Sequence, residues 1–475
     1  MKTIHAYTLL ALATIATTAT AQFRIGSGDV SELYANNCAA CHGANLEGGQ
    51  ASSLVDDTWI HGRTDSDLAR IIREGIPDTT MVPWGTTLSK QKIRSLVIFI
   101  REKGQIVARE GLPQNTFLPE DGIFRTAEHA FTLEKVGQGE GILWALEFLP
   151  DDTILATQRN GTLWQFKDGQ RSAIAGTPEV WQNGQGGLLE IQKHPDYANN
   201  GWIYLAYSEN VGGTENDRPA GMTAVVRGRI RDGQWVDQEK IYNAPPHLHT
   251  SAGAHFGTRF VFQDGYLYFG IGDRGRQNQA QDLSRPNGKI HRIHDDGRVP
   301  ADNPFLDTKD ALPTIWSYGH RNPQGLDLHP ETGDMWEVEH GPRGGDETNL
   351  IERGLNYGWP VITYGMNYNG TPITDLIEKE GMEQPKHYWV PSIAICGMDF
   401  YEGEKFPKWK NNLFVTGMAS QELHRLVIKD GEVVSDEIVL KNQGRLRDVY
   451  SAPDGTLYIL SENDNGTIYR LVPST

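Results

Sequence analysis

The sequence has little cysteine, with three residues among 475, and two of them lie in the short stretch NCAACHG. If those two bind a common group, Cys396 has no internal partner. A disulfide framework is then excluded, and we expect Cys396 to be a small packed side chain rather than a reactive thiol.

Long apolar runs, basic charge and common catalytic motifs are also scarce. No stretch beyond residue 21 approaches the roughly 18 uninterrupted apolar residues of a membrane-spanning helix. The sequence has 44 Lys and Arg residues and 61 Asp and Glu residues. The resulting net charge of −17 argues against a nucleic-acid-binding surface. No GxSxG, no HExxH and no GxGxxG between a strand and a helix is found. What is abundant is Gly (52) and Pro (24), which favours turns and β structure.

The first 21 residues have the pattern of a secretory signal peptide. Lys2 precedes the apolar run LLALATIA, and the small residues Ala19, Thr20 and Ala21 follow as a cleavage site. A buried N-terminal helix is the alternative interpretation. We expect the mature protein to be periplasmic or secreted.

The NCAACHG motif predicts a c-type haem. Cys38 and Cys41 are followed directly by His42, which is the spacing for two thioether bonds and a proximal iron ligand on one helical turn. Met81, in a Pro-rich loop, is the only methionine between residues 21 and 200, and we predict it as the second axial ligand. His61 is the alternative.

A helix is expected to close this first unit. In SKQKIRSLVIFIREKG the apolar residues recur at helical spacing and Gly104 stands at the position of a C-cap. The segment resembles the last helix of a class I cytochrome c. We therefore expect a cytochrome c domain at 22–103 and a linker at 104–123. The apolar positions are Ile93, Leu96, Val97 and Ile100.

One pattern recurs six times between residues 124 and 475. A turn rich in Pro, Asp or Gly precedes a short alternation of apolar and polar residues, beginning at 148, 193, 260, 328, 405 and 451. Such repetition predicts a mainly β fold, a six-bladed β-propeller preceded by the small all-α domain. Five or seven blades remain open, and a two-sheet sandwich would need more even spacing.

Polar loops follow the predicted strands and concentrate arginine in an otherwise acidic chain. Guanidinium forks suggest an anionic ligand with several carboxylates, whereas ion pairs at blade edges are the alternative for each arginine. His247, His249 and His255 lie close together, but no Cys or acid joins them, so one base and two loop histidines is the simpler interpretation. The arginines are Arg274, Arg276, Arg321, Arg343, Arg445 and Arg447.

An ordered set of segments carries a resemblance over about 124–472. ILWALEFLPDD, GQGGLLEIQKHPDY, HFGTR, GHRNPQGLDLHP, EHGPRGGDETNLIERGLNYGWP and RLRDVYSAPDG resemble the soluble glucose/sorbosone dehydrogenases, or aldose sugar dehydrogenases, which depend on pyrroloquinoline quinone (PQQ). The resemblance implies a six-bladed propeller that oxidises aldoses at C1 to lactones with PQQ and Ca²⁺.

The resemblance also implies roles for matching residues. His255 matches the general base, Asp273 the acid that orients it, and Asp346 an acid nearby. The quinone-binding positions are matched by Gln185, Arg321, Asn322, Ser392, Arg445 and Arg447. The carbonyls of Gly341 and Pro342 match ligands of the Ca²⁺ at PQQ, and Glu347 with the Tyr357 carbonyl matches a structural Ca²⁺ site.

Three positions depart from the family pattern and leave the sugar open. Ala254 stands where the glucose-oxidising branch has an acid, Ala419 where that branch has a lysine facing the quinone, and Cys396 where a smaller residue is usual.

The two parts together imply a quinohaemoprotein sugar dehydrogenase. Electrons would pass from PQQ to the haem c of the same chain, because a short linker raises the effective concentration, and then to an external soluble cytochrome, copper protein or oxidase. The alternatives are a PQQ-dependent sorbosone or aldehyde dehydrogenase, a non-catalytic ligand-binding propeller carrying a cytochrome, and a lactonase-type hydrolase, whose metal carboxylates are not evident.

Overall fold

The computed structural model describes residues 29–56, 58–110, 119–462 and 465–474. The predicted signal peptide, 1–21, lies outside the described residues, and so does part of the predicted linker, 111–118. Within the described ranges, no helix is both long and apolar enough to cross a membrane.

The described part of the N-terminal unit contains the helices α1 (Asp29–Asn37), α2 (Ala39–His42), α3 (Asp65–Glu74) and α4 (Lys90–Glu110). The start of α3 is fixed by a capping box. The Thr64 hydroxyl accepts from the Asp67 N–H at 3.1 Å, and the Asp67 carboxylate accepts from the Thr64 N–H at 3.1 Å. The four apolar residues predicted on one face of α4 are all buried in the core of this unit.

Helix α4 is longer than its sequence pattern indicated. The predicted end at Gly104 is wrong, since the helix continues to Glu110. A glycine inside a helix costs only about 1 kcal/mol relative to alanine, and the following residues, Gln105 to Ala108, are compatible with a helix. Two residues of this last part, Gln105 and Ile106, line a cavity shared with the propeller, described below.

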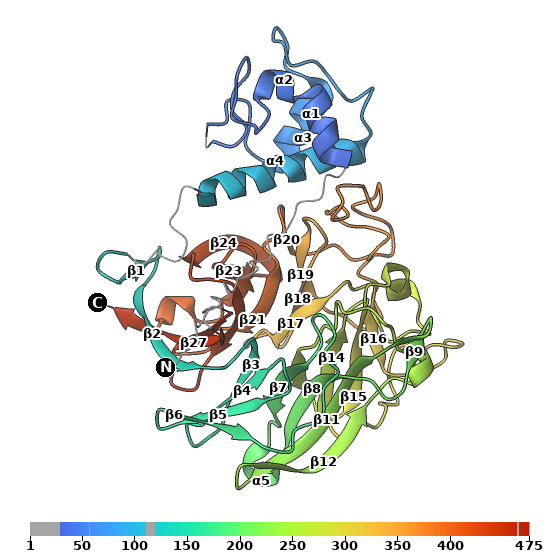
Figure 1. The fold of residues 1–475 in the computed structure, drawn as a ribbon, viewed down its shortest axis with the longest axis vertical. Coiled ribbons are helices and arrows are strands. Elements are labelled where there is room, and N and C mark those ends of the chain that lie inside the picture. Colours follow the sequence, from blue (N-terminus) through green and yellow to red (C-terminus); the bar gives the residue numbers. More distant parts are fainter. Residues whose placement is uncertain (1–28, 57, 111–118, 463–464, 475) are drawn as a thin grey trace, which may run out of the picture.

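The remaining chain forms six sheets of four or more strands arranged as propeller blades, so the predicted blade number is confirmed (Figure 1). Each sequence repeat falls in a different sheet. The first three blades contain β3 (Leu143–Phe148), β4 (Ile154–Gln158), β5 (Leu163–Lys167) and β6 (Gln170–Ile174); β7 (Leu188–Lys193), β8 (Ile203–Glu209), β11 (Met222–Arg231) and β12 (Gln234–Tyr242); and β13 (Phe260–Gln263), β14 (Tyr266–Ile271), β15 (Lys289–His294) and β16 (Ile315–Tyr318).

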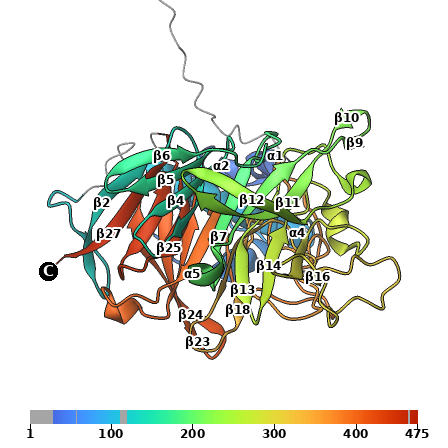
Figure 2. The ribbon, with the colours of Figure 1, turned by 90° about the horizontal axis from the view of Figure 1, so that it is seen from below.

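The other three blades follow the same antiparallel order. They contain β17 (Pro323–Leu328), β18 (Met335–Glu339), β19 (Asp346–Leu350) and β20 (His387–Trp389); β21 (Ile395–Phe400), β22 (Leu413–Gly417), β23 (Glu422–Lys429) and β24 (Glu432–Lys441); and β25 (Leu446–Ser451), β26 (Leu457–Ser461), β27 (Thr467–Ser474), β2 (Ala130–Gln138) and β1 (Phe124–Arg125). Shorter elements are α5 (Tyr197–Asn200), η1 (Pro246–Leu248), η2 (Gln277–Gln281), η3 (Pro407–Trp409) and the hairpin β9 (Thr214–Glu215) and β10 (Arg218–Pro219), which projects from the rim (Figure 2).

The ring is closed by strands from both ends of the domain. β2 pairs antiparallel with β27, so the last blade joins residues near 130 to residues near 470. The apolar clusters lie between neighbouring blades: Leu155 and Leu163 of one blade, for example, pack with Leu188 and Leu205 of the next. Such a sheet buries both faces, which is why the central strands β3 and β4 are buried throughout.

Antiparallel order places particular loops at one end of the ring. The loop between the second and third strands of a blade and the loop that leads to the next blade must emerge on the same side, because successive strands reverse direction. Those loops carry most of the predicted site residues, and α4 is the helix of the N-terminal unit that lies nearest the propeller (Figure 1).

Candidate active site

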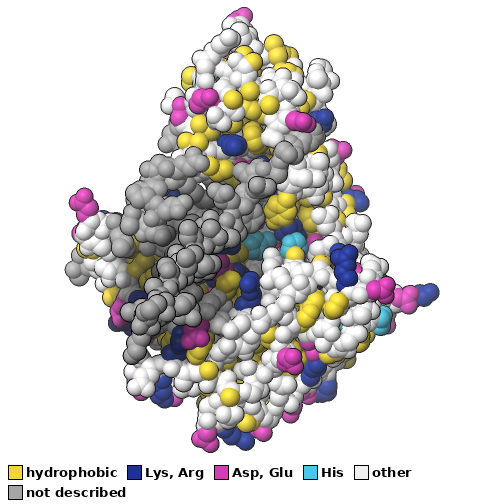
Figure 3. Space-filling view, in the orientation of Figure 1, with side chains coloured by type: hydrophobic (Ala, Val, Ile, Leu, Met, Phe, Trp, Pro, Cys, Tyr) yellow, Lys and Arg dark blue, Asp and Glu magenta, His cyan; other side chains and the backbone are white. Residues whose placement is uncertain are grey.

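A cavity of about 740 Å³ opens among these loops. It lies in the hollow between the helical unit and the ring, where histidine side chains are visible (Figure 3). The predicted site residues that line it are Gln185, His255, Arg321, Asn322, Pro342, Ser392, Arg445 and Arg447. Those that do not line it are Asp273, Asp346, Gly341, Glu347 and Tyr357.

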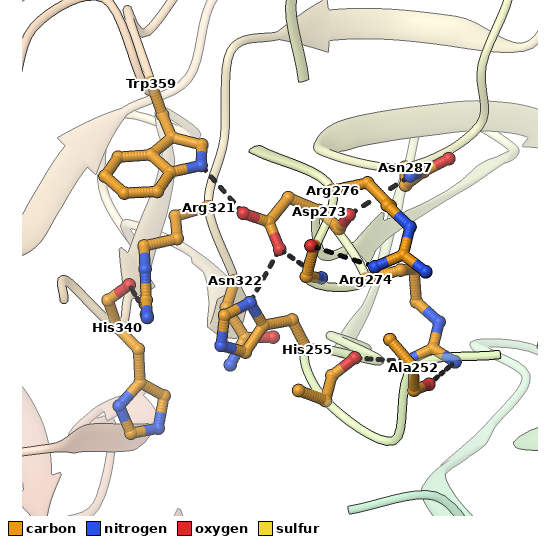
Figure 4. A network of polar contacts seen from close by, with 12 residues as sticks. Ala252, His255, Asp273, Arg274, Arg276, Asn287, Arg321, Asn322, His340 and Trp359 are labelled. Carbon is orange, nitrogen blue, oxygen red and sulfur yellow. Dashed lines mark hydrogen bonds and ion pairs between the residues drawn. The ribbon is translucent and has the colours of Figure 1, made fainter. Parts of the chain in front are cut away.

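His255 and Asp273 form a hydrogen-bonded pair at this cavity (Figure 4). The Nδ1–H of His255 donates to Asp273 Oδ1 at 2.6 Å, and Asp273 Oδ2 accepts from Trp359 Nε1–H at 2.8 Å. Asp273 is fully buried, whereas the His255 side chain keeps 15% of its surface exposed. With Nδ1 donating, the lone pair on Nε2 is available to accept a proton.

The surroundings keep His255 neutral. Burial and the charge of Arg321 lower the pKa of His255, and they outweigh the opposing effect of its hydrogen bond to Asp273. The main chain of His255 has φ +53°, a region that costs a non-glycine residue energy and often marks a functional position. Its N–H donates to Gln185 Oε1 at 2.7 Å, which fixes the loop. A neutral, oriented imidazole is suited to act as a general base.

Arg321 enters the cavity beside His255 with unused hydrogen-bonding capacity. One guanidinium nitrogen donates to the His340 carbonyl at 2.9 Å, but its buried Nε has no partner among the described residues. Its main-chain N–H and that of Asn322 both donate to Glu339, at 2.5 and 3.1 Å. A rigid guanidinium with an unsatisfied donor indicates a ligand that accepts hydrogen bonds.

Arg445 and Arg447 share one carboxylate on the opposite side of the cavity. Their Nε atoms donate to Glu462 at 2.8 and 2.9 Å. Burial raises the pKa of Glu462, but the two guanidinium groups more than offset this and lower it to about 2. Two cations against one anion leave a positive charge for an anionic ligand.

Not every predicted arginine faces this cavity. Arg274 is fully buried, donates to the carbonyls of Ala252 and Ala254, and stacks on the Phe256 ring, so it braces the loop before His255 (Figure 4). Arg276 pairs with Glu215 at 2.5 Å. For these two the ion-pair or structural interpretation holds. The other four line the cavity, although Arg343 also forms an ion pair, with Glu102.

Of the three histidines that lie close together in the sequence, only His255 lines the cavity. His249 is buried and hydrogen-bonds the carbonyl of Ala244 at 3.0 Å, and His247 is exposed. Among the described residues, neither belongs to a group that could hold a metal ion. This arrangement supports the interpretation of one base and two loop histidines.

Asp346 lies behind the cavity wall and holds two loops together. It is fully buried and accepts from the Gly341 N–H at 2.9 Å, from the Ser392 hydroxyl at 2.8 Å and from the Ile395 N–H at 3.1 Å. Burial raises the pKa of Asp346 to about 6. A side chain at Gly341 would meet the Gly345 carbonyl oxygen at 2.0 Å, so this turn, which offers the Gly341 and Pro342 carbonyls, requires glycine.

A second cluster of carboxylates lies in the same blade as Asp346, on β18 and β19. Ligand atoms of His320, Glu337 and Glu339 are within 4.8 Å of one another, and the buried His320 Nδ1 and Glu337 Oε1 have no hydrogen-bond partner among the residues that the structure describes. Glu347 pairs with Glu339 across the strands, and Tyr357 stacks on His320 at 4.6 Å. Burial and the charge of Glu339 raise the pKa of both Glu337 and Glu347. Such carboxylates fit a hard cation.

The predicted haem residues all lie in the helical unit. His42 Nδ1–H donates to the Ser52 carbonyl at 2.9 Å, which leaves Nε2 available as an iron ligand. Cys38 and Met81 both pack against the apolar core of the unit, whereas His61 is exposed. This favours Met81 over His61, and the residues present fit a covalently bound haem.

The sequence reasoning missed several residues of the cavity. Arg159 and Trp144 come from the first blade, and His340 and Tyr368 come from the loops around β19. Burial and the nearby Arg447 lower the pKa of Arg159, whose charge adds to the cationic wall. His340 could have been found, since it directly precedes the Gly341–Pro342 turn, but Tyr368 lies in a loop without any motif.

Comparison with known families agrees with this geometry. Residues 141–470 match the family described as glucose/sorbosone dehydrogenase. The chain belongs to this family. Residues 29–100 match the description cytochrome c oxidase, cbb3-type, subunit III, so the expected combination of a cytochrome c domain with a glucose/sorbosone dehydrogenase domain is confirmed.

Individual relatives of this glucose/sorbosone dehydrogenase extend the comparison. The aldose sugar dehydrogenase of Escherichia coli is 42% identical over 339 residues, which cover 70% of this chain and 90% of the relative. The solved apo-form of the soluble E. coli enzyme has a TM-score of 0.68 at 38% identity, covering 72% of this chain and all of that one. The PQQ-bound aldose sugar dehydrogenase of Streptomyces coelicolor has a TM-score of 0.58 at 25% identity, covering 72% and 98%.

Proposed function

We propose that the protein oxidises aldoses at C1 to lactones with PQQ and Ca²⁺, and that it passes the electrons to its own haem c. The observation that carries the proposal is the His255–Asp273 pair at a cavity lined by Arg159, Arg321, Arg445 and Arg447, besides Arg343, which pairs with Glu102. In this proposal residues 22–103 are the haem domain, 124–475 the dehydrogenase domain and 104–123 the linker, whose first part, 104–110, forms the end of helix α4. A periplasmic or secreted location follows from the predicted signal peptide.

The cationic wall fits the cofactor. PQQ carries three carboxylates, and Arg321, Arg445 and Arg447 offer guanidinium forks, with a partnerless Nε on Arg321. The Gly341 and Pro342 carbonyls would bind the Ca²⁺ at PQQ, and Glu347 with its neighbouring carboxylates and the Tyr357 carbonyl would bind a structural Ca²⁺. Gln185, Asn322 and Ser392 complete the proposed quinone site.

The chain's own residues supply the proton transfer. His255 Nε2 accepts the proton of the C1 hydroxyl, while Asp273 holds Nδ1–H and stabilises the imidazolium that forms. Asp346 acts on the site only through the turn and the Ser392 hydroxyl that it holds. When bound, PQQ polarised by Ca²⁺ supplies the acceptor for the C1 hydrogen and two electrons. Met81 and His42 would hold the haem iron, which would supply a one-electron acceptor.

The test uses the full chain with its haem attached and oxidised. PQQ and Ca²⁺ are added, then a panel of aldoses and simple aldehydes, while the haem absorption band is followed without any dye. We expect aldoses to reduce the haem only when PQQ and Ca²⁺ are both present, and His255→Ala to bind PQQ while leaving the haem oxidised. Preference for simple aldehydes would instead favour the sorbosone or aldehyde alternative. A haem that stays oxidised with every aldose, despite bound PQQ, contradicts the proposed function.

A further inference from the structure

Helix α4 has two buried faces. One consists of the apolar residues in the core of the helical unit, and the other meets the propeller. Arg94 donates to the carbonyls of Thr363 at 3.0 Å and Asp375 at 3.2 Å. Ile98, one turn further on, is fully buried although it lies off the core-facing pattern, and it lies 3.5 Å from the position that a side chain at Gly344 would occupy.

An ion pair fixes the next turn of this second face. The Arg343 guanidinium donates to both carboxylate oxygens of Glu102, at 2.5 to 2.8 Å, and only 8% and 18% of the two side chains is exposed. Paired groups with this geometry and burial hold a helix in one position far better than a surface ion pair does. The C-terminal part of α4 is therefore positioned against the loop that contains Pro342.

This position brings α4 into the wall of the cavity. Glu102, Gln105 and Ile106 line the same cavity as His255 and Arg321. They are three and four residues apart, so they lie on one side of the helix. Both oxygens of Glu102 are used by Arg343, whereas the Gln105 side chain makes no hydrogen bond with any residue that the structure describes.

We propose that Gln105 binds the substrate's hydroxyl groups remote from C1, and that Ile106 limits the size of the sugar that fits. The inference rests on the proposed function and assigns part of its specificity to the N-terminal helical unit. An amide that both donates and accepts is suited to neutral hydroxyls. The anionic cofactor, by contrast, would be drawn to the arginines. The positioning residues are Glu102 and Arg343.

The kinetic test compares Gln105→Ala with Val107→Ala, a matched change at an exposed position that does not line the cavity. We expect Gln105→Ala to raise the KM for aldoses about 3- to 10-fold, the loss of one neutral hydrogen bond, with kcat within twofold of wild type. Ile106→Ala should raise activity on disaccharides relative to monosaccharides, and Val107→Ala should change neither. Unchanged KM and unchanged size preference overturn the inference.

A labelling test separates this inference from the proposed function. Gln105→Cys and Val107→Cys are each treated with a maleimide, with and without an aldose, in the PQQ- and Ca²⁺-loaded protein. Protection of position 105 alone by the sugar supports the inference, and equal labelling with and without sugar overturns it. If the wild type oxidises no sugar at all, the proposed function fails, and the labelling result still decides whether α4 contacts a sugar.

Discussion

Replacing Asp273 by asparagine removes one charge from the centre of the site without changing its shape. All three hydrogen-bond partners that the structure describes for the Asp273 carboxylate are N–H groups: His255 Nδ1–H at 2.6 Å, the Gly275 N–H at 2.7 Å and Trp359 Nε1–H at 2.8 Å. An amide has one oxygen, so its NH₂ group must face a donor in either orientation. In one orientation the NH₂ group faces the Trp359 Nε1–H. In the other it faces the Gly275 N–H and donates to His255 Nδ1, which moves the imidazole proton to Nε2.

The expected loss follows from the role of the base. A positioned general base is worth about 10²- to 10⁴-fold, or roughly 3 to 5.5 kcal/mol of barrier. Since the asparagine weakens His255 without removing it, we expect kcat to fall about 10²- to 10³-fold. Loss of the Asp273 charge also lowers the pKa of His255 further, because that charge raises it in the wild type. The acid limb of the kcat/KM profile should therefore move to lower pH.

Sugar oxidation is measured against pH with a dye acceptor, and PQQ binding is measured separately by absorbance titration. Trp359→Phe is the matched control, because it removes a single donor to Oδ2 and keeps the charge. We expect it to lower kcat about tenfold, or about 1.4 kcal/mol, close to the lower end of what a hydrogen bond to a charged group contributes, with an acid limb near that of the wild type. If Asp273→Asn keeps kcat within about fivefold of wild type while binding PQQ, Asp273 does not orient the base.

Two further predictions concern the haem and the propeller. Met81→Ala should lower the haem reduction potential while the haem stays attached, because it removes the thioether ligand that raises the potential. His61→Ala should leave the potential unchanged. A potentiometric titration measures both variants, and the reverse outcome would make His61 the ligand. Burial lowers the pKa of His424, but hydrogen bonds to Asp436 and Glu422 prevail and raise it to about 9. Relative to an unfolded value of about 6.5, this contributes about 3 kcal/mol of stability below pH 6.5 that is lost as the pH rises through 9. Denaturant unfolding at pH 6 and pH 10 should show this difference in the wild type and not in His424→Gln.

Features carried by short stretches of sequence were predictable. Cys38, Cys41 and His42 share one turn, and the six repeats each mark one blade, because a blade is a local antiparallel unit. The pairing of His255 with Asp273, which are 18 residues apart, could be inferred because both residues match the motifs of the family that the sequence resembles.

Features that depend on distant contacts were not predictable. Arg274 and Arg321 are both arginines in polar loops, and only the fold shows that one braces the chain while the other reaches the cavity. The contacts that position helix α4, through Arg94 and Glu102, reach propeller residues that are far away in the sequence. The Glu102–Arg343 pair, 241 residues apart, leaves no local signal in the sequence.

The segment Gly341–Gly345 of the propeller contacts both the cavity and the helical unit. Pro342 lines the cavity, Arg343 pairs with Glu102 of α4, and Gly344 lies against Ile98. Asp346, directly after it, anchors the Gly341 N–H. Because one short turn carries both the proposed Ca²⁺ carbonyls and the contact with the helical unit, α4 cannot move away without releasing Arg343 beside the cofactor site. In the proposed function, closure of the cavity around the sugar and the approach of the haem unit to the proposed site of oxidation would therefore depend on the same contact.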